Sequence, residues 1–242
     1  MQAQEHYEKH LANFYSWMVG ELEPKSNEFQ SLLKHYGIEP KNTKTAIDLG
    51  AGNGIQSIAL KGLGFEVTAV DFNEQLLNEL KANPKASGIK IKLTDIKNVG
   101  EFESLKPELI VCCGDTITHL NDKREIEELV SDASRTLENN GYLILTFRNY
   151  TGELDDQQRF IPVKSTENRI LTCILEYERE KVKVTDLLQE RINGEWTQKV
   201  STYKKVRIDP KEVVQILEKN GMSLKLNESI NRMETIIAIK EV

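Results

Sequence analysis

The sequence predicts an α/β fold built on a doubly wound, mostly parallel sheet. Three observations indicate it. Short apolar segments alternate with amphipathic ones from residue 45 to residue 147, a glycine-rich loop directly follows the first apolar segment, and the alternation returns near the end of the chain. Strands that are apolar at nearly every position are typical of a sheet covered by helices on both faces. Apolar residues make up 39% and charged residues 29% of the 242 residues, a globular composition.

The first forty residues carry aromatic and apolar side chains at helical spacing, beginning with Tyr7 and Phe14 and continuing with Phe29 and Leu33. This spacing predicts two amphipathic helices separated near Pro24. On spacing alone, the aromatic side chains of the first helix are more typical of a packed core than of a cover over a ligand.

The alternating segments that follow predict five strands and the helices between them. Strands are expected at Ala46–Leu49, Glu66–Val70, Ile89–Leu93, Leu109–Cys113 and Tyr142–Phe147. Helices are expected at Ile55–Leu63, Glu74–Lys81 and Lys123–Leu137. Glycine and proline residues fall between these segments, where they end periodic elements.

After residue 147 the pattern changes to long, charged segments in which apolar and polar residues alternate. Such alternation predicts an antiparallel sheet with one face exposed to water. Its strands are expected at Ile170–Tyr177, Lys181–Leu188 and Trp196–Val206, and Asn193-Gly194 predicts a hairpin turn between the last two.

The earlier pattern then resumes with a helix at Pro210–Asn220 and strands at Ser223–Leu226 and Glu234–Lys240. We therefore divide the chain into three parts. Residues 1–149 form amino-terminal helices and a ligand-binding core, residues 150–208 form an inserted antiparallel sheet, and residues 209–242 complete the core sheet. The insertion is interpreted as a lid or an interface, and an exposed edge in it would allow a homodimer.

Charge and composition exclude several classes of partner. Lys and Arg total 32 against 38 Asp and Glu, a net charge of −6, so we expect no nucleic-acid partner. No segment approaches the roughly eighteen consecutive apolar residues of a membrane span, so no membrane association is expected. The first ten residues are polar and mixed in charge, which favours a cytoplasmic location over secretion.

The cysteine and histidine spacing predicts neither a disulfide framework nor a metal site. Cys112 and Cys113 are adjacent and Cys173 is distant, which indicates reduced, buried thiols. His6 and His10 lie four residues apart, the spacing of metal ligands on a helix, but no third ligand is evident. We therefore expect no metal.

The loop Asp48-Leu49-Gly50-Ala51-Gly52-Asn53-Gly54 ends the first strand and opens a helix. Its glycines allow a tight turn and close approach of a ligand to the backbone, and the helix offers free N–H groups. Asp71 ends the next strand, where a carboxylate can accept both hydroxyls of a ribose. Asp95 follows the third strand, at a position from which an adenine edge could be read.

Two kinds of ligand use such a layout. A dinucleotide requires a third glycine where this chain has Ile55, because that glycine lets the helix pack closely on the strand. Asp48, just before the loop, suits a ligand with an ammonium end rather than a pyrophosphate. This combination points to S-adenosylmethionine, which carries a sulfonium and an amino acid but no phosphate.

These residues resemble the class I S-adenosylmethionine-dependent methyltransferases, whose Asp-x-Gly-x-Gly-x-Gly motif and following acidic residues occur here in the same order. The resemblance implies a Rossmann-like, seven-stranded sheet whose last strand, here Glu234–Lys240, is antiparallel. It implies S-adenosylmethionine as the methyl donor and S-adenosylhomocysteine as the product. The donor-binding residues that it implies are Asp48, Gly50, Ala51, Gly52, Gly54, Asp71, Phe72, Asp95, Ile96, Cys113 and Gly114.

A narrower resemblance, to glycine and sarcosine N-methyltransferases, lies in the segment from Cys112 to Leu120 and in Arg148-Asn149-Tyr150. That subgroup also inserts an antiparallel sheet at this place. The resemblance implies that Arg148 binds a substrate carboxylate and that amino-terminal aromatic residues close over the donor. The chain departs from the subgroup in having no arginine before Arg124, so Lys9 or Lys25 would have to serve the donor carboxylate. The substrate-binding candidates are Tyr7, Tyr15, Trp17, His119, Arg148 and Tyr150.

His119 and Asp115 are the candidate catalytic residues. A sulfonium is already activated, so the protein mainly positions the two reactants, but an amine must arrive deprotonated. His119 suits the role of base or orienting group, and a helix-capping histidine is an equal alternative. Asp115 either faces the pocket or caps the next helix, and Arg148 either binds a carboxylate or forms a structural ion pair.

We expect a methyltransferase that acts on a small molecule, at an amine or amino-acid-like nitrogen. The Asn/Asp-Pro-Pro-Tyr signature of enzymes that methylate adenine or glutamine amides is absent after the fourth strand. The alternatives are an O- or C-methyltransferase for a small hydroxylated metabolite, a donor-binding protein without catalysis, and a nicotinamide oxidoreductase.

Overall fold

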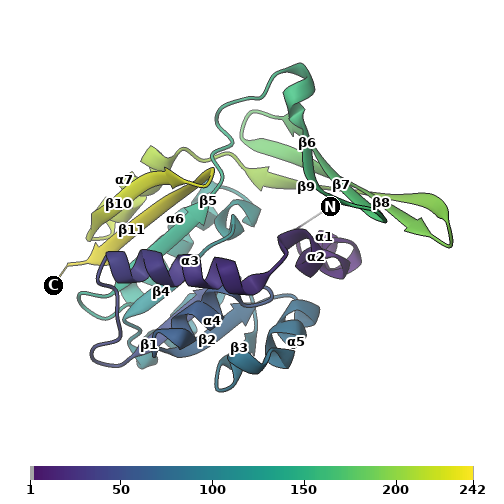
Figure 1. The fold of residues 1–242 in the computed structure, drawn as a ribbon. Coiled ribbons are helices and arrows are strands. Elements are labelled where there is room, and N and C mark those ends of the chain that lie inside the picture. Colours follow the sequence, from purple (N-terminus) through teal and green to yellow (C-terminus); the bar gives the residue numbers. More distant parts are fainter. Residues whose placement is uncertain (1–2, 242) are drawn as a thin grey trace.

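The computed structural model describes residues 3–241, which form two sheets. The larger is a seven-stranded sheet with the order β10-β11-β5-β4-β1-β2-β3, and the smaller is a four-stranded sheet with the order β6-β7-β8-β9 (Figure 1). The predicted α/β class and the predicted inserted antiparallel sheet are confirmed. Across residues 3–241, no helix is long and apolar enough to cross a membrane.

Five strands of the large sheet run parallel, and the last two are antiparallel to their neighbours. The strands of this sheet are β1 (Thr45–Leu49), β2 (Glu66–Asp71), β3 (Lys90–Leu93), β4 (Leu109–Cys112), β5 (Tyr142–Phe147), β10 (Met222–Ile230) and β11 (Met233–Lys240). Because β1 pairs with β2 on one side and with β4 on the other, the winding direction reverses at β1. A crevice forms at the carboxyl ends of strands at such a reversal, where ligands bind in open α/β sheets.

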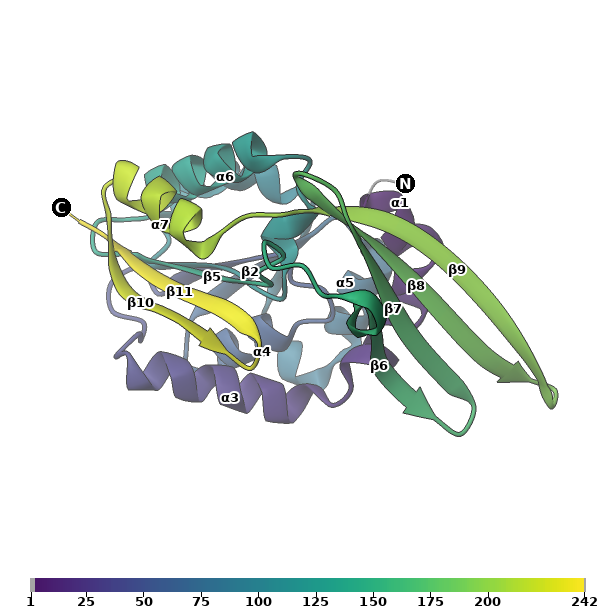
Figure 2. The same cartoon turned by 90° about the horizontal axis from the view of Figure 1, so that it is seen from above.

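Helices cover both faces of this sheet, with α3 and α4 on one face and α6 and α7 on the other (Figure 2). The α-helices are α1 (Ala3–Lys9), α2 (Tyr15–Val19), α3 (Leu22–His35), α4 (Ile55–Gly62), α5 (Glu74–Ala82), α6 (Lys123–Thr136) and α7 (Pro210–Lys219). The 3₁₀ helices are η1 (Leu11–Asn13), η2 (Pro84–Ala86), η3 (Ile96–Leu105), η4 (Thr116–His119) and η5 (Asp156–Arg159). Apolar side chains of α6 and α7 pack together with strand residues, and those of α3 and α4 form a second cluster on the opposite face.

Two local predictions for the core are wrong. The amino-terminal helices are separated at Gly20, which has a φ of 82°, and Pro24 lies in the first turn of α3, where its missing N–H is tolerated. The third strand is not buried on both faces. All four residues of β3 are exposed, because it is the edge strand of the sheet.

The smaller sheet consists of β6 (Phe160–Thr166), β7 (Arg169–Tyr177), β8 (Lys181–Ile192) and β9 (Glu195–Val206). Strand β6 was not predicted. Buried and part-exposed residues alternate along most of β8, as expected for a sheet with one wet face. The predicted hairpin turn is present, with positive φ angles of 52° at Asn193 and 87° at Gly194, and the β8–β9 hairpin extends beyond the core (Figure 2).

Helices α1 and α2 lie between the two sheets (Figure 1). Helix α1 contacts β9 of the inserted sheet. Leu11 and Phe14 are buried together with Leu171 of β7 and Leu188 of β8. The inserted sheet is therefore packed onto the amino-terminal segment, which in turn covers the carboxyl ends of the core strands.

Candidate functional site

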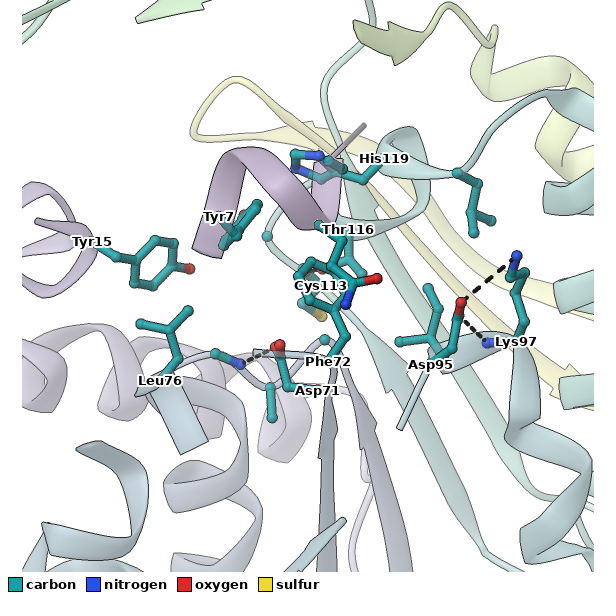
Figure 3. Close-up of a pocket in the computed structure, with 18 of the residues that line it drawn as sticks. Tyr7, Tyr15, Asp71, Phe72, Leu76, Asp95, Lys97, Cys113, Thr116 and His119 are labelled. Carbon is teal, nitrogen blue, oxygen red and sulfur yellow. Dashed lines mark hydrogen bonds and ion pairs between the residues drawn. The ribbon is translucent and has the colours of Figure 1, made fainter. Parts of the chain in front are cut away.

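A cavity lies at the carboxyl ends of the core strands, beneath the amino-terminal helices (Figure 3). It encloses about 1150 Å³ of space, its open mouth included. The residues predicted to bind the donor or substrate that line it are Tyr7, Tyr15, Gly50, Ala51, Gly52, Asp71, Phe72, Asp95, Ile96, Cys113, Gly114 and His119. They come from α1, α2 and the segments that follow β1, β2, β3 and β4.

The glycine loop between β1 and α4 has three residues with positive φ, namely 75° at Gly50, 53° at Gly52 and 95° at Gly54. A side chain at Gly50 would place its Cβ 2.4 Å from Thr116, and one at Gly54 would place it 2.1 Å from Leu80. Gly54 therefore packs the loop onto α5 and does not line the cavity. Gly50 and Gly52 leave the cavity floor as bare backbone.

Asp71, at the end of β2, forms the polar end of the cavity (Figure 3). Its Oδ2 accepts a hydrogen bond of 2.8 Å from the Gly52 amide, and its Oδ1 accepts one of 2.8 Å from the Asn73 amide. The side chain is almost fully buried, and burial raises the pKa of its carboxyl. Because a carboxylate has about four acceptor sites, Asp71 can also accept hydrogen bonds from two hydroxyls of a ligand.

The segment after β3 forms another wall. The Asp95 carboxylate accepts a hydrogen bond of 2.9 Å from the Lys97 amide and lies 3.7 Å from Lys97 Nζ (Figure 3). Ile96 is buried beside it, and Phe72 contacts Tyr7 edge to face with ring centroids 5.5 Å apart. This wall combines apolar contacts with one exposed acid, as the flat polar ring of an adenine requires.

Asp48 lies below the loop and is not in the lining. Its Oδ2 accepts a hydrogen bond of 2.6 Å from the Ser57 hydroxyl of α4. Burial raises the pKa of Asp48 to about 7. Its predicted role toward a ligand ammonium stays a prediction, and the position allows that role only through the loop backbone.

Two of the three predicted amino-terminal aromatic residues reach the cavity. Tyr7 and Tyr15 line it, and the Tyr7 ring contacts the His119 ring edge to face at 5.5 Å. Trp17 lies instead against the inserted sheet, where Lys164 and Arg169 are placed over its ring at 5.4 and 5.1 Å. Helical spacing alone does not separate these two outcomes.

His119 ends the 3₁₀ helix η4 and lines the cavity. Its Nδ1 is buried and has no hydrogen-bond partner among residues 3–241. Burial, the nearby Lys205 ammonium and His6 hold the pKa of His119 well below its usual range. The imidazole is therefore neutral at neutral pH, and one of its two ring nitrogens can accept a hydrogen bond.

Asp115, Arg148 and Tyr150 do not line the cavity. The Asp115 carboxylate accepts hydrogen bonds from the Arg148 amide at 2.8 Å, the Tyr150 hydroxyl at 2.7 Å and Lys205 Nζ. It also accepts one of 2.9 Å from the Thr118 hydroxyl. Tyr150 is thereby buried, whereas the Arg148 side chain is exposed. The geometry of Asp115 fits a role in holding backbone and side chains rather than contact with a ligand.

Several residues that surround His119 were not singled out from the sequence. Tyr203 stacks on His119 with ring centroids 5.5 Å apart and on His6 at 4.0 Å. His6, considered above only for metal spacing, is buried, with Nδ1 2.8 Å from Ser201 Oγ and Nε2 3.1 Å from Asp186 Oδ2. The alternation of β9 was the available signal, but it does not reveal what the strand faces.

Comparison with known proteins identifies the core. Residues 46–141 match the family described as "Methyltransferase domain". These residues are a class I, S-adenosylmethionine-dependent methyltransferase domain. The chain is 28% identical over 130 residues to a glycine/sarcosine N-methyltransferase from Aphanothece halophytica, a match covering 53% of this chain and 47% of that protein. The chain thus spans about half or less of the length of the curated relatives of that description that it matches.

The likeness of solved structures extends over nearly the whole chain. An S-adenosylmethionine-dependent methyltransferase from Clostridium acetobutylicum ATCC 824 superposes with a TM-score of 0.76 at 14% identity, covering 98% of this chain and 99% of that one. An amino pentose methyltransferase from Micromonospora echinaspora gives a TM-score of 0.73 at 12% identity, covering 91% and 92%. At such low identities the similarity establishes only the fold, which includes the inserted sheet.

The cavity of the methyltransferase domain fits its donor. The bare backbone of the loop leaves room for the methionine part, and the free acceptor capacity of Asp71 matches the two ribose hydroxyls. The wall formed by Phe72, Asp95 and Ile96 offers apolar contacts and one acid, which suits the adenine that the resemblance assigns to it. Tyr7 and His119 then lie on the side of the cavity that faces the inserted sheet.

We expect Asp71→Ala to weaken donor binding by about 1–3 kcal/mol, because two hydrogen bonds to a charged group are lost. Calorimetry with S-adenosylhomocysteine measures this as a dissociation constant raised about 5- to 150-fold. Asp132→Ala, at a surface acid of α6 that pairs with Arg135, is the matched control and leaves the constant unchanged. An unchanged affinity in Asp71→Ala would place the ribose elsewhere.

We expect Asp48 to make the ligand-free protein less stable as pH rises. A carboxyl whose pKa is raised from 3.8 to about 7 favours the folded state when protonated, so its contribution declines between about pH 4 and pH 7. Asp48→Asn imitates the protonated form and should raise the free energy of unfolding by about 4 kcal/mol at pH 8 and leave it nearly unchanged at pH 4. Urea titrations at both pH values measure the difference, and an equal effect at the two would contradict the assignment.

Proposed function

We propose that this protein transfers a methyl group from S-adenosylmethionine to a nitrogen of a small amine or amino-acid-like molecule. The observation that carries the proposal is the meeting, in one cavity, of the glycine loop and Asp71 with His119, whose buried Nδ1 has no hydrogen-bond partner among residues 3–241. The first two suit the donor, and the third suits an acceptor that must lose a proton. The description of several relatives, glycine/sarcosine N-methyltransferases, supports a nitrogen acceptor.

In this proposal the chain contributes position, exclusion of water and a proton acceptor. When bound, the donor supplies a methyl group already activated by its sulfonium. Gly50 and Gly52 approach the ligand with their backbone, and Asp71 fixes its ribose. Tyr7 and Tyr15 cover the cavity and exclude water, so the two reactants meet without competing solvent.

Among the cavity residues named above, His119 is the one that suits interaction with the methyl acceptor. An amine is a nucleophile only when it is deprotonated, and a neutral imidazole, unlike an imidazolium, can accept a hydrogen bond from the N–H of the amine and so assist the loss of its proton. His119 lines the cavity, and its Nδ1 atom is buried and has no hydrogen-bond partner among the described residues. An O- or C-methyl acceptor would use the same donor site, and a donor-binding protein without catalysis would use it as well.

Arg148 is proposed to bind an acidic group of the acceptor. Its backbone is fixed by the hydrogen bond from its amide to Asp115, and its side chain is exposed at the end of β5. A guanidinium offers two parallel donors to a carboxylate. The role is supported by the resemblance and by the position of Arg148 directly after β5.

The first experiment distinguishes a protein that binds S-adenosylmethionine from one that binds NAD. Calorimetry with S-adenosylhomocysteine and with NAD should show binding of the former and none of the latter, because Ile55 replaces the glycine that a dinucleotide requires. Tight binding of NAD without a response to S-adenosylhomocysteine would overturn the proposal in favour of an oxidoreductase.

The second experiment tests the acceptor. Radiolabelled methyl transfer is measured with glycine, sarcosine, other primary and secondary amines, and a matched set of hydroxylated acceptors. Turnover with amines supports the proposal. Turnover with hydroxylated acceptors alone contradicts it and supports the alternative hypothesis of an O-methyltransferase. Binding of the donor without any turnover supports a protein that binds the donor only.

We expect Arg148→Ala to raise the KM for an acidic amine about tenfold or more and to leave the KM for an uncharged amine unchanged, because only the carboxylate contact is removed. Arg124→Ala, at an exposed arginine of α6, serves as the control. If Arg148→Ala changes the KM of the acidic amine no more than that of the uncharged amine, Arg148 does not bind the carboxylate. The proposal of methyl transfer itself would be unaffected.

A further inference from the structure

One face of β9 connects the inserted sheet to the cavity. Ser201, Tyr203 and Lys205 are all buried and occupy alternate positions, so their side chains leave the same face of the strand. Ser201 contacts His6 of α1, Tyr203 stacks on His119, and Lys205 Nζ donates to Asp115. This face therefore reaches both the helix that covers the cavity and the turn that carries His119.

Asp115 holds that turn in an uncommon conformation. Its φ is 76°, in the left-handed region that favours glycine, asparagine and aspartate. Its backbone carbonyl accepts hydrogen bonds from the amide and the hydroxyl of Thr118, at 3.2 and 2.8 Å, so η4 is built directly on Asp115. His119 is the last residue of η4, and its place depends on how Asp115 is held.

Lys205 supplies the cation for the buried Asp115 carboxylate. The two side chains are 9% and 4% exposed, and the Lys205 ammonium also lies 5.7 Å from the ring centroids of Tyr150 and Tyr203. A carboxylate this deeply buried is strongly unfavourable without a cationic partner. The ion pair thus joins β9 to the turn after β4, although neither residue lines the cavity.

The titratable groups around His119 come from two elements besides its own turn. Helix α1 contributes Tyr7 and His6, and β9 contributes Tyr203 and Lys205. The positive charge of Lys205 disfavours the imidazolium form of His119. If Lys205 loses its charge, the negative charge of the Asp115 turn is no longer balanced, and the imidazolium becomes more favourable.

We propose that Lys205 is a positioning residue for methyl transfer, which acts through Asp115 to fix the η4 turn and to keep the His119 imidazole uncharged beside the cavity. The inference rests on the proposed function and deepens it. It gives the inserted sheet a part in the reaction besides covering the cavity.

The test uses the full chain, four lysine variants and one histidine variant that serves for assignment. Lys205→Met removes the positive charge. Lys205→Gln removes the charge but keeps a hydrogen-bond donor for Asp115, and Lys205→Arg keeps the charge. Lys204→Met is the matched control, because Lys204 precedes Lys205 on β9, is exposed on the opposite face and pairs with Glu178 at 2.7 Å. The pH titration of His119 is followed by the NMR signal of its Cε1–H, assigned by the loss of that signal in His119→Gln.

We expect the midpoint of the His119 titration to lie about one pH unit higher or more in Lys205→Met and Lys205→Gln than in the natural chain. In Lys205→Arg and Lys204→Met the midpoint should equal that of the natural chain. In methyl transfer with the most active amine of the panel, the acid limb of the kcat profile should move the same way, so that kcat at a pH on that limb falls about tenfold. The dissociation constant for S-adenosylhomocysteine should stay within about twofold, since Asp71 and the loop are untouched.

An unchanged His119 titration in the Lys205→Met or Lys205→Gln variant would overturn the inference. So would a loss of donor affinity parallel to any loss of kcat, because that pattern indicates a general structural defect. Should Lys205→Met fail to fold, Lys205→Gln decides alone. Failure of the proposed function itself is distinguishable, because the NMR titration needs neither donor nor acceptor.

Discussion

The buried carboxylate of Asp115 is the point at which three parts of the chain meet. It accepts hydrogen bonds from the turn after β4, from the end of β5 and from Lys205 on the inserted sheet. The carboxylate therefore fixes the inserted sheet relative to the core. That connection brings Tyr203 against His119 and His6, and it adds to the apolar packing of Leu11 and Phe14 on the inserted sheet.

A buried ion pair is a demanding way to join two sheets. Its attraction is offset by the loss of hydration of both charges, so its net contribution to stability is small, whereas removing one partner is strongly destabilising. An apolar contact would tolerate sliding of β9 along the core, but the ion pair and the hydrogen bonds around it are satisfied in one register. We interpret the pair as a determinant of geometry, which is what a site for two reactants requires.

The parts of the site that could be predicted are those set by local sequence. The glycine loop, Asp71 and Asp95 each follow a strand directly, and parallel strands bring their carboxyl ends together, so their meeting follows from the order of elements. The position of the inserted sheet depends on packing between segments far apart in sequence. For that reason Lys205 and the partners of His6 could not be foreseen, and Tyr7 and Trp17, both at helical spacing, took different environments.

The exposed edge strand β3 has a consequence for how the molecule behaves at high concentration. An edge strand offers unpaired backbone groups to any other chain, and such edges are a route to aggregation. Here the edge is only four residues long and carries Lys90 and Lys92, so a second copy approaching it would meet like charges before many backbone hydrogen bonds could form. This edge of the large sheet is in this way protected against pairing with a second molecule.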